Sequence, residues 1–446
     1  MLVELQRAIP DDSRLQKAWN ELVGHMDHPE VFHTYEWAKA ASHAYGKSLQ
    51  PWLLLAHEGS ELAGVACLGI DSQNRASFLS GTTADYCDLV SRPENRPQLV
   101  ETVFAELRRS GVEDVAFANL PEDSPTVAAL SGVAASLGYH LSARTGYFCP
   151  RFSLGSAEQR KCLKDEIRKK KSYRYGINAL ARQGPITLTH LKTWHEIKPA
   201  LPEFYVAHVA RFLSKDRLSN IAHMERRVFL SELARLLSQS GWLALTQLRV
   251  NNVPIAWNYG FSFKGGWFYY QPTFDTKFEK YSPGVCLLSS MIVEACDSPS
   301  WLTFDLGLGA EGYKERFALG APRRTLYVSL SRSGARHFRE VARYQVAQML
   351  KQSPRMEISV RNAIERIRAI RAGGANSQFL SSRQLLAKAL SSRKETSFPE
   401  SSQPALLESS ALHSDHLVPI DFRVLAEAVM ARENDTEFQH QEPSGA

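Results

Sequence analysis

Two stretches of this sequence repeat the same order of strand and helix patterns, and this repeat limits the chain to a small set of folds. In the first stretch, apolar alternation predicts a hairpin over 52–70, with its turn at Glu58-Gly59-Ser60, and a third strand over 75–79. A helical pattern over 98–109 and a strand over 114–118 follow. Because strand, helix and strand alternate after the hairpin, the stretch predicts a mixed α/β unit.

The second stretch carries the same elements at nearly the same spacing. Its hairpin turn is Asn251-Asn252, a dipeptide typical of tight turns. Trp52 and Val115 are 63 residues apart, and Trp242 and Leu302 are 60 residues apart. We therefore expect two copies of one α/β domain. The elements predicted for the second copy are strands over 242–250, 253–261 and 267–271, a helix over 285–295 and a strand over 301–306.

The bulk properties of the chain are those of a globular protein. Of its 446 residues, 44% are hydrophobic and 22% are charged, with a formal net charge of +6. The six cysteines form no CxxC pair and have no histidine at zinc-finger spacing, so we expect reduced thiols and no bound metal. The N-terminus MLVELQRAIPDD lacks a signal-peptide pattern, and no apolar run reaches the roughly 20 residues of a membrane span. We expect a cytoplasmic protein with no transmembrane segment.

The changes in pattern and composition along the chain divide it into five segments. The predicted division is an N-terminal domain over 1–155, a basic helical connector over 156–190, a C-terminal domain over 191–332, basic helices over 333–372 and a mostly disordered tail over 373–446.

The connector is strongly basic. Between Arg160 and Arg182 it has nine lysines and arginines against Asp165 and Glu166, with an apolar stripe at helical spacing. One interpretation is a solvated helix that braces the two domains. The other is a basic arm that faces an anionic substrate, either a nucleotide or an RNA.

The predicted helix start near 282 has the features of an anion site. Ser282 can act as N-cap, Pro283 suits the first helical position, and Gly284 lets a phosphate approach the backbone. Free N–H groups at a helix start favour negative charge. The first copy has Glu94 and no glycine at the equivalent place, so we expect the site only in the second copy. The alternative is an ordinary capped helix. The residues of this candidate site are Lys280, Tyr281, Ser282, Pro283, Gly284 and Val285.

A set of motifs in the second copy resembles the CelD/BcsL-like acetyltransferases, GNAT-fold proteins associated with exopolysaccharide and cellulose biosynthesis. The N-terminal segment Phe32–Trp37 looks like that family's aromatic-Trp motif, and His208 and Arg211 resemble its helix before the second unit. The family is similar to the Fem-type peptidyl transferases, which pair two GNAT units and use aminoacyl-tRNA. The resemblance covers roughly residues 25–330, and its motifs are Tyr269-Tyr270, Asp275, Tyr281-Ser282-Pro283-Gly284, Phe304-Asp305, Gly309, Tyr313-Lys314 and Phe317.

The resemblance implies an α/β protein with tandem GNAT-like (acyl-CoA N-acyltransferase) domains, each a mixed, mostly antiparallel sheet flanked by helices. It implies transfer of an acetyl or other acyl group from acyl-CoA, as co-substrate, to an amine or hydroxyl of a sugar or nucleotide-sugar in surface polysaccharide synthesis. Residues 280–285 keep only part of the (Gln/Arg)-x-x-Gly-x-(Gly/Ala) loop that grips the coenzyme A pyrophosphate. Two alternatives therefore stay open: a Fem-like transferase that uses aminoacyl-tRNA, and a non-catalytic scaffold or regulator.

Acyl transfer needs a proton acceptor and a group that stabilises the oxyanion. Asp305 ends a strand and is the candidate base, although it can instead cap the turn at Gly307–Gly309. By resemblance, Lys314 stabilises the oxyanion or binds phosphate. His208 can line the acceptor cleft or simply pack among aromatic neighbours. The candidate substrate-binding residues are Trp37, Asp85, Tyr86, His208, Arg211, Tyr270, Asp275 and Tyr313.

Overall fold

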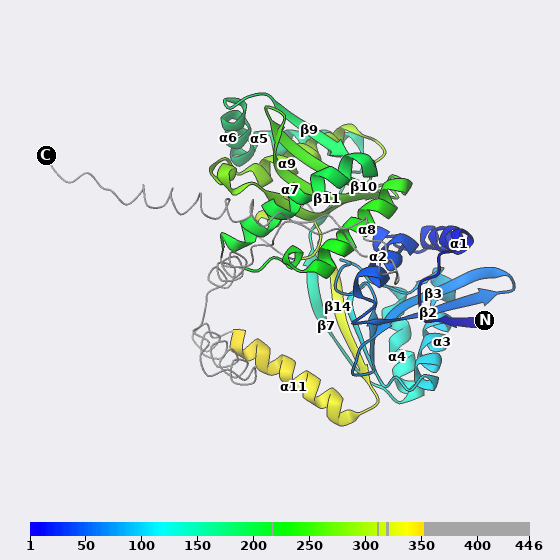
Figure 1. Ribbon diagram of the computed structural model, residues 1–446. Helices are drawn as coiled ribbons and strands as arrows, with labels where there is room; N and C mark the ends of the chain where they lie inside the picture. Colours follow the sequence, from blue (N-terminus) through cyan, green and yellow to red (C-terminus); the bar gives the residue numbers. More distant parts are fainter. Residues whose placement is uncertain (216, 310–311, 318–320, 352–446) are drawn as a thin grey trace, which may run out of the picture.

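The computed structural model describes residues 1–215, 217–309, 312–317 and 321–351, and Figure 1 shows them as two lobes, each built on one sheet. The predicted tail over 373–446 and the last part of the predicted basic helices, 352–372, lie outside the described residues. Within the described part, no helix is long and apolar enough to cross a membrane.

The first sheet, sheet A, is made mainly by the N-terminal third of the chain. All of its pairings are antiparallel except that of β4 with β6. Its strand order among the described residues is β1 (Leu2–Gln6), β2 (Gln50–Glu58), β3 (Glu61–Ile70), β4 (Arg75–Phe78), β6 (Asp114–Pro121), β14 (Arg323–Ser331) and β7 (His140–Cys149), with β5 (Val90–Ser91) paired to β3.

The second sheet, sheet B, has the same plan. Its pairings are antiparallel except that of β12 with β13. The parallel pair has the same place in both sheets, between the third strand of a unit and the strand after its helix, so the predicted repeat is confirmed. The order in sheet B is β8 (Arg151–Ser153), β13 (Thr303–Asp305), β12 (Gly266–Phe274), β11 (Val253–Phe263), β10 (Leu243–Val250) and β9 (Ile186–Leu191).

The two sheets exchange strands. β14 comes from the C-terminal part of the chain and inserts between β6 and β7 of sheet A. β8 follows β7 across Pro150 and pairs with β13 of sheet B. These strands cross the predicted domain boundaries at 155 and 191, so how the chain divides into independently folding units stays a prediction.

Helices flank both sheets. α9 carries an apolar face that packs on β10, β11 and β12, and the basic helices α5 and α6 pack in turn on α9. The helices are α1 (Ser13–Gly24), α2 (Tyr35–Tyr45), α3 (Arg96–Arg109), α4 (Pro125–Leu137), α5 (Ala157–Lys169), α6 (Lys171–Ala181), α7 (Trp194–Leu213), α8 (Met224–Ser240), α9 (Pro283–Asp297), α10 (Gly312–Glu315) and α11 (Gly334–Lys351), with 3-10 turns at η1 (Val31–His33), η2 (Pro93–Asn95), η3 (Asn220–Ala222) and η4 (Thr276–Tyr281).

One hydrophobic core joins the two lobes. Trp37 of α2 makes edge-on contacts with Phe32, Phe261 and Tyr270, so aromatic rings from both halves interlock. α2 also packs against α8, as Figure 1 shows. Because burial of large aromatic side chains contributes much of the stability of a core, the lobes are held together by apolar packing as well as by exchanged strands.

Candidate functional site

A cavity opens in sheet B where two strands diverge. The parallel strands β12 and β13 pair only at Gly266–Phe268 with Thr303–Asp305. β13 then ends, while β12 continues to Phe274. Tyr269 to Pro272 of β12 line the resulting cavity of about 810 Å³, which lies between the two lobes and is closed on the other side by the loop 81–85 of the first lobe.

Asp85 and Lys314 meet at one residue of the cavity wall. Leu308 donates its N–H to Asp85 Oδ2 at 3.4 Å, and Lys314 Nζ donates to the Leu308 carbonyl oxygen at 2.6 Å. Both side chains line the cavity and are largely buried, at 9% and 6% exposure. A cation and a carboxyl group therefore lie side by side at a water-poor surface.

The pKa of Asp85 is raised to about 7. Burial is the largest cause, and the negative charge of Asp305 adds to it, while the charge of Lys314 acts in the opposite direction. A carboxyl group with a pKa near neutrality can accept a proton at physiological pH and pass it on. Asp85 thus has the properties required of a general base.

Asp305 lies beneath the cavity and does not line it. Its Oδ1 accepts the Gly307 N–H at 2.7 Å, and its Oδ2 accepts the Tyr86 hydroxyl at 2.7 Å. Burial raises the pKa of Asp305, and these two hydrogen bonds act against that rise. The geometry is that of a carboxylate that holds the turn after β13.

The turn after β13 requires glycine. Gly307 has φ +72, a backbone conformation that residues with a Cβ rarely adopt. A Cβ atom at this position would lie 2.6 Å from Asp85 Oδ2. Glycine therefore allows Asp85 to approach the turn that also carries Leu308.

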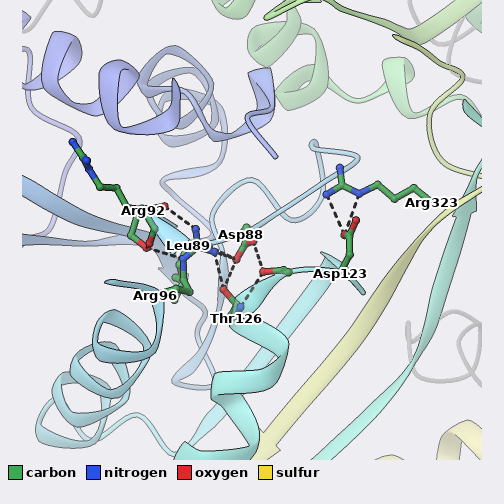
Figure 2. A network of polar contacts seen from close by, with 9 residues as sticks. Asp88, Leu89, Arg92, Arg96, Asp123, Thr126 and Arg323 are labelled. Carbon is green, nitrogen blue, oxygen red and sulfur yellow. Dashed lines mark hydrogen bonds and ion pairs between the residues drawn. The ribbon is translucent and has the colours of Figure 1, made fainter. Parts of the chain in front are cut away.

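Figure 2 shows the polar network of the first lobe beside this site. Arg323 of β14 pairs with Glu30 at 2.5 Å and with Asp123 at 3.2 Å. Its guanidinium also lies 4.7 Å from the ring centroid of Tyr86. The exchanged strand β14 thus supports the tyrosine that holds Asp305.

A second part of the same network stabilises the segment after Cys87. Asp88 forms a buried ion pair with Arg96 at 3.0 Å and accepts the Thr126 hydroxyl at 2.5 Å. This fixes the chain that carries Asp85 and Tyr86 against α3 and α4.

The opposite wall of the cavity comes from α7, α8 and described residues between them, and is cationic. Arg226 Nη2 donates to the Tyr270 hydroxyl at 2.6 Å, and Tyr270 in turn donates to the Thr83 carbonyl oxygen. Among the described residues, Asp85 is the one acid that lines the cavity. The lysines and arginines that line it are Arg211, Lys215, Arg217, Arg226 and Lys314.

His208 also lines this wall but is buried and uncharged. Its Nδ1 lies 2.9 Å from Ser219 Oγ, and its ring stacks on Phe212. Burial, with the charges of Arg211 and Arg226, lowers the pKa of His208 to about 3. It can therefore form a neutral hydrogen bond in the cavity wall without contributing a positive charge.

The predicted anion site at the start of α9 lies outside the cavity lining. Pro283 begins the helix as predicted, but Ser282 has φ +54 and its side chain caps no N–H group. A Cβ on Gly284 would lie 3.2 Å from Phe274, and the Arg211 guanidinium lies 4.7 Å from the same ring. Through Phe274, the helix start therefore adjoins the cationic end of the cavity.

The structure brings together six of the predicted site residues: Asp85, His208, Arg211, Tyr270, Tyr313 and Lys314 line the cavity. Tyr86 and Asp305 lie beneath the cavity. Trp37 lies in the shared core, where its Nε1 donates to Thr83 Oγ1, and Asp275 caps η4. The chemical roles of these residues, and of Lys280, Tyr281 and Val285 near the helix start, stay predictions.

Sequence reasoning missed three cations of the wall, Lys215, Arg217 and Arg226. Arg226 and Arg227 stand together just before the apolar stripe of α8, and the sequence carries no sign that both are buried. Among the described residues, no group of three or more His, Cys, Asp and Glu side chains is arranged to hold a metal ion.

Comparison with known proteins identifies the fold. Residues 168–315, about a third of the chain, match the family model described as acetyltransferase (GNAT) domain. GNAT domains in general use acyl-CoA as donor, and the match supports acyl transfer as the class of reaction. A search of the curated proteins found no match.

Solved structures resemble the chain over most of its described length. A conserved protein of unknown function from Bacteroides thetaiotaomicron is 11% identical, with a TM-score of 0.51 over 74% of this chain and 100% of that chain. The C-terminal domain of a putative lysylphosphatidylglycerol synthetase from Agrobacterium fabrum is 14% identical, with a TM-score of 0.48 over 75% and 96%. FemX is 9% identical, with a TM-score of 0.48 over 70% and 95%. With the repeated sheets and the GNAT match, the chain has a tandem GNAT-like α/β fold, as predicted.

Proposed function

We propose that this chain is a CelD/BcsL-like acyltransferase that moves an acetyl or other acyl group from acyl-CoA to an amine or hydroxyl of a sugar or nucleotide-sugar. The observation that carries the proposal is the Asp85–Leu308–Lys314 arrangement at the wall of the cavity. It pairs a carboxyl group whose pKa is about 7 with a buried cation, and acyl transfer needs both a proton acceptor and an oxyanion partner.

In this mechanism the acceptor oxygen or nitrogen attacks the acyl carbonyl carbon and transfers its proton to the Asp85 carboxylate. The ammonium of Lys314 stabilises the negative charge that develops on the carbonyl oxygen. When the carbon–sulfur bond breaks, the leaving thiolate takes the proton from Asp85, and the products are the acylated acceptor and a free thiol. Asp305 and Tyr86 position the turn that carries Leu308, which replaces our sequence-based hypothesis of Asp305 as the base.

The donor's phosphates fit the start of α9, with Lys280 and Gly284, and its acyl end reaches the cavity past Phe274 and Arg211. The support for this path is that the Phe274 ring lies beside both Gly284 and the Arg211 guanidinium. The cavity itself has five cations against one acid, which favours a phosphate-bearing acceptor, such as a nucleotide-sugar, over a neutral sugar.

Calorimetric titration with acetyl-CoA tests the donor. Wild type should bind, and Gly284→Glu should lose binding because the new side chain contacts Phe274 and adds negative charge at the helix start. The matched control is Gly132→Glu, which places the same side chain in open space on α4. Absence of binding by wild type, or equal binding by wild type and Gly284→Glu, would contradict the donor assignment.

Release of free thiol in the presence of acceptor panels tests the reaction. Nucleotide-sugars should stimulate thiol release more than the matching neutral sugars, and Asp85→Asn should abolish the stimulation. If no acceptor of either class stimulates release, or if Asp85→Asn reacts as fast as wild type, the proposed reaction is wrong. Acylated polysaccharide missing from a deletion strain would place the acceptor in surface polysaccharide synthesis.

One observation favours aminoacyl-tRNA as a second candidate donor. Lys170, between α5 and α6, donates to the Arg316 carbonyl oxygen, so the basic connector reaches the segment that carries Lys314. Lys169 and Lys171 beside it are exposed. Filter binding of tRNA by wild type and by a variant with Lys169, Lys170 and Lys171 changed to Ala tests this candidate. If wild type does not bind tRNA, aminoacyl-tRNA is excluded as the donor.

A further inference from the structure

Helix α11 carries an exposed apolar stripe on its outward face. Phe338, Val346 and Met349 are 71%, 55% and 67% exposed. At 3.6 residues per turn these three positions lie on one side of the helix. Figure 1 shows α11, in yellow, running outward from the end of β14 at the edge of the first lobe.

The inward face of α11 is attached to sheet A by polar contacts. Glu340 pairs with Arg75 of β4 at 3.2 Å, and Arg336 pairs with Asp114 of β6 at 2.5 Å. The Arg144 guanidinium lies 4.1 Å from the ring centroid of Tyr344. These contacts engage Glu340 and Asp114 and fix which side of α11 faces the solvent.

A basic hollow lies beside the stripe. It measures about 440 Å³ between α11 and the edge of β4, β6 and β14. Four arginines line it against the two acids already paired, and the exposed Arg339 and Arg343 form no ion pair with a described acid. The Nε of Arg75 is buried at its wall with no hydrogen-bond partner among the described residues. A buried unpaired donor and an excess of cations together favour an anionic group in the hollow.

We propose that α11 docks the protein on an anionic lipid surface, with Phe338, Val346 and Met349 entering the interface and the hollow with Arg339 and Arg343 taking lipid phosphates. A bilayer presents phosphate groups directly next to acyl chains, so one surface matches both the basic flank and the apolar stripe. An acidic protein surface would match the arginines but would leave the stripe exposed. This inference does not depend on the proposed reaction.

Co-sedimentation of the full chain with vesicles tests the proposal. One set of vesicles is phosphatidylcholine alone, and the other is phosphatidylcholine and phosphatidylglycerol in equal parts. Wild type should partition onto the anionic vesicles about tenfold or more over the neutral ones, and rising salt should reduce that preference. Equal binding to both sets, or binding that salt does not change, overturns the proposal.

Paired variants separate the two parts of the surface. Arg339→Glu with Arg343→Glu should lose about tenfold or more on anionic vesicles, and Phe338→Ser with Met349→Ser should lose a similar factor. The matched control reverses two exposed charges elsewhere, Lys161→Glu with Lys169→Glu on α5, and should keep binding. An equal loss in the control overturns the proposal.

A second copy of the chain is the competing occupant of the stripe. Light scattering of the lipid-free protein checks it: a dimer that Phe338→Ser with Met349→Ser dissociates would overturn lipid docking, and a monomer that binds vesicles would support it. Since the altered side chains are exposed, thermal melting of the variants should match wild type. If a variant nevertheless fails to fold, the salt series with wild type still decides the question.

Discussion

The Tyr86 hydroxyl donates a 2.7 Å hydrogen bond to Asp305 Oδ2 across 219 positions of sequence. It joins the first lobe to the end of β13, directly beneath the turn that Asp85 and Lys314 both contact. A change at Tyr86 should therefore affect stability and activity together, although Tyr86 does not line the cavity.

Tyr86→Phe should lower the free energy of unfolding by about 1–3 kcal/mol, because the buried Asp305 loses the partner of one oxygen. Urea denaturation measures the change, and kcat should fall as the turn at Gly307 loosens. Tyr139→Phe is the matched control: the Tyr139 hydroxyl is buried without a partner among the described residues, so its removal should cost nothing. Equal losses in the two variants would mean that the hydrogen bond to Asp305 contributes no stability.

Asp85→Asn should lower kcat by about 10²–10⁴-fold, because the amide cannot accept the acceptor's proton. Steady-state thiol release measures it. Asp275→Asn changes a predicted site residue that caps η4 outside the cavity lining, and should keep near-normal activity. Should Asp275→Asn be the more damaging of the two, the base would have to be sought outside the cavity.

The dependence of activity on pH should follow the ionisation of Asp85. Since the carboxylate is the reactive form and the pKa is about 7, kcat/KM should rise with pH and level off above neutrality. A profile that is flat between about pH 5 and pH 8 would argue against this group.

Stability should change with pH in the opposite direction. The pKa values of Asp85 and Glu30 are both raised to about 7, so between the ordinary carboxyl pKa and about 7 the folded state binds more protons than the unfolded state. Their contribution to the free energy of unfolding is therefore fully present at low pH and is lost as the pH rises through 7. Asp85→Asn should flatten this decline and raise the melting temperature at pH 8, which calorimetry at several pH values can check.

Arg323→Met should destabilise the fold by about 3–5 kcal/mol, because it leaves Glu30 and Asp123 without their shared cation. The next residue offers a matched control. Arg324 is half exposed, and its ion pair with Glu122 is long, at 3.9 Å. Arg324→Met should therefore change the free energy of unfolding by less than about 1 kcal/mol. Chemical denaturation compares them, and Glu30→Gln with Asp123→Asn should partly rescue Arg323→Met. A similar cost for both arginines would show that the pairing of Arg323 with Glu30 and Asp123 adds nothing to stability.

The cationic wall should act on substrate binding and not on the chemical step. Arg217→Ala should raise KM for a phosphate-bearing acceptor by about tenfold, with kcat nearly unchanged, since one charge-assisted contact contributes about 1.5 kcal/mol. Arg182→Ala removes an exposed arginine at the end of α6 and should leave KM unchanged. An unchanged KM for Arg217→Ala would indicate that the phosphate lies elsewhere.

The local elements of the fold could be predicted from the sequence, and the long-range pairings could not. Turn residues such as Asn251-Asn252 and the apolar periodicity of 285–295 act over short distances, so the hairpin and helix α9 were found where they lie. The position of β14 depends on partners in β6 and β7 about two hundred residues away, and nothing in its own pattern names them.

The candidate site divides in the same way. Family resemblance pointed to Lys314, and Asp85 was a candidate substrate-binding residue; the structure brings both to one residue, Leu308. The burial of Asp305 under Tyr86 follows from a tertiary hydrogen bond, so the sequence left its two roles open. The role of Arg226 in the cavity wall could not be predicted, because a sequence does not distinguish a buried arginine from a solvent-exposed one.

The exchange of β8 and β14 between the sheets has a consequence for how such a chain can evolve. Each sheet contains a strand encoded at the C-terminal end of the other repeat, so a gene fragment carrying a single repeat would specify a sheet with a missing strand and exposed edges. Recombination can therefore not swap one repeat for a foreign copy unless the strands at both ends match. The two repeats must therefore be inherited together, as parts of one gene.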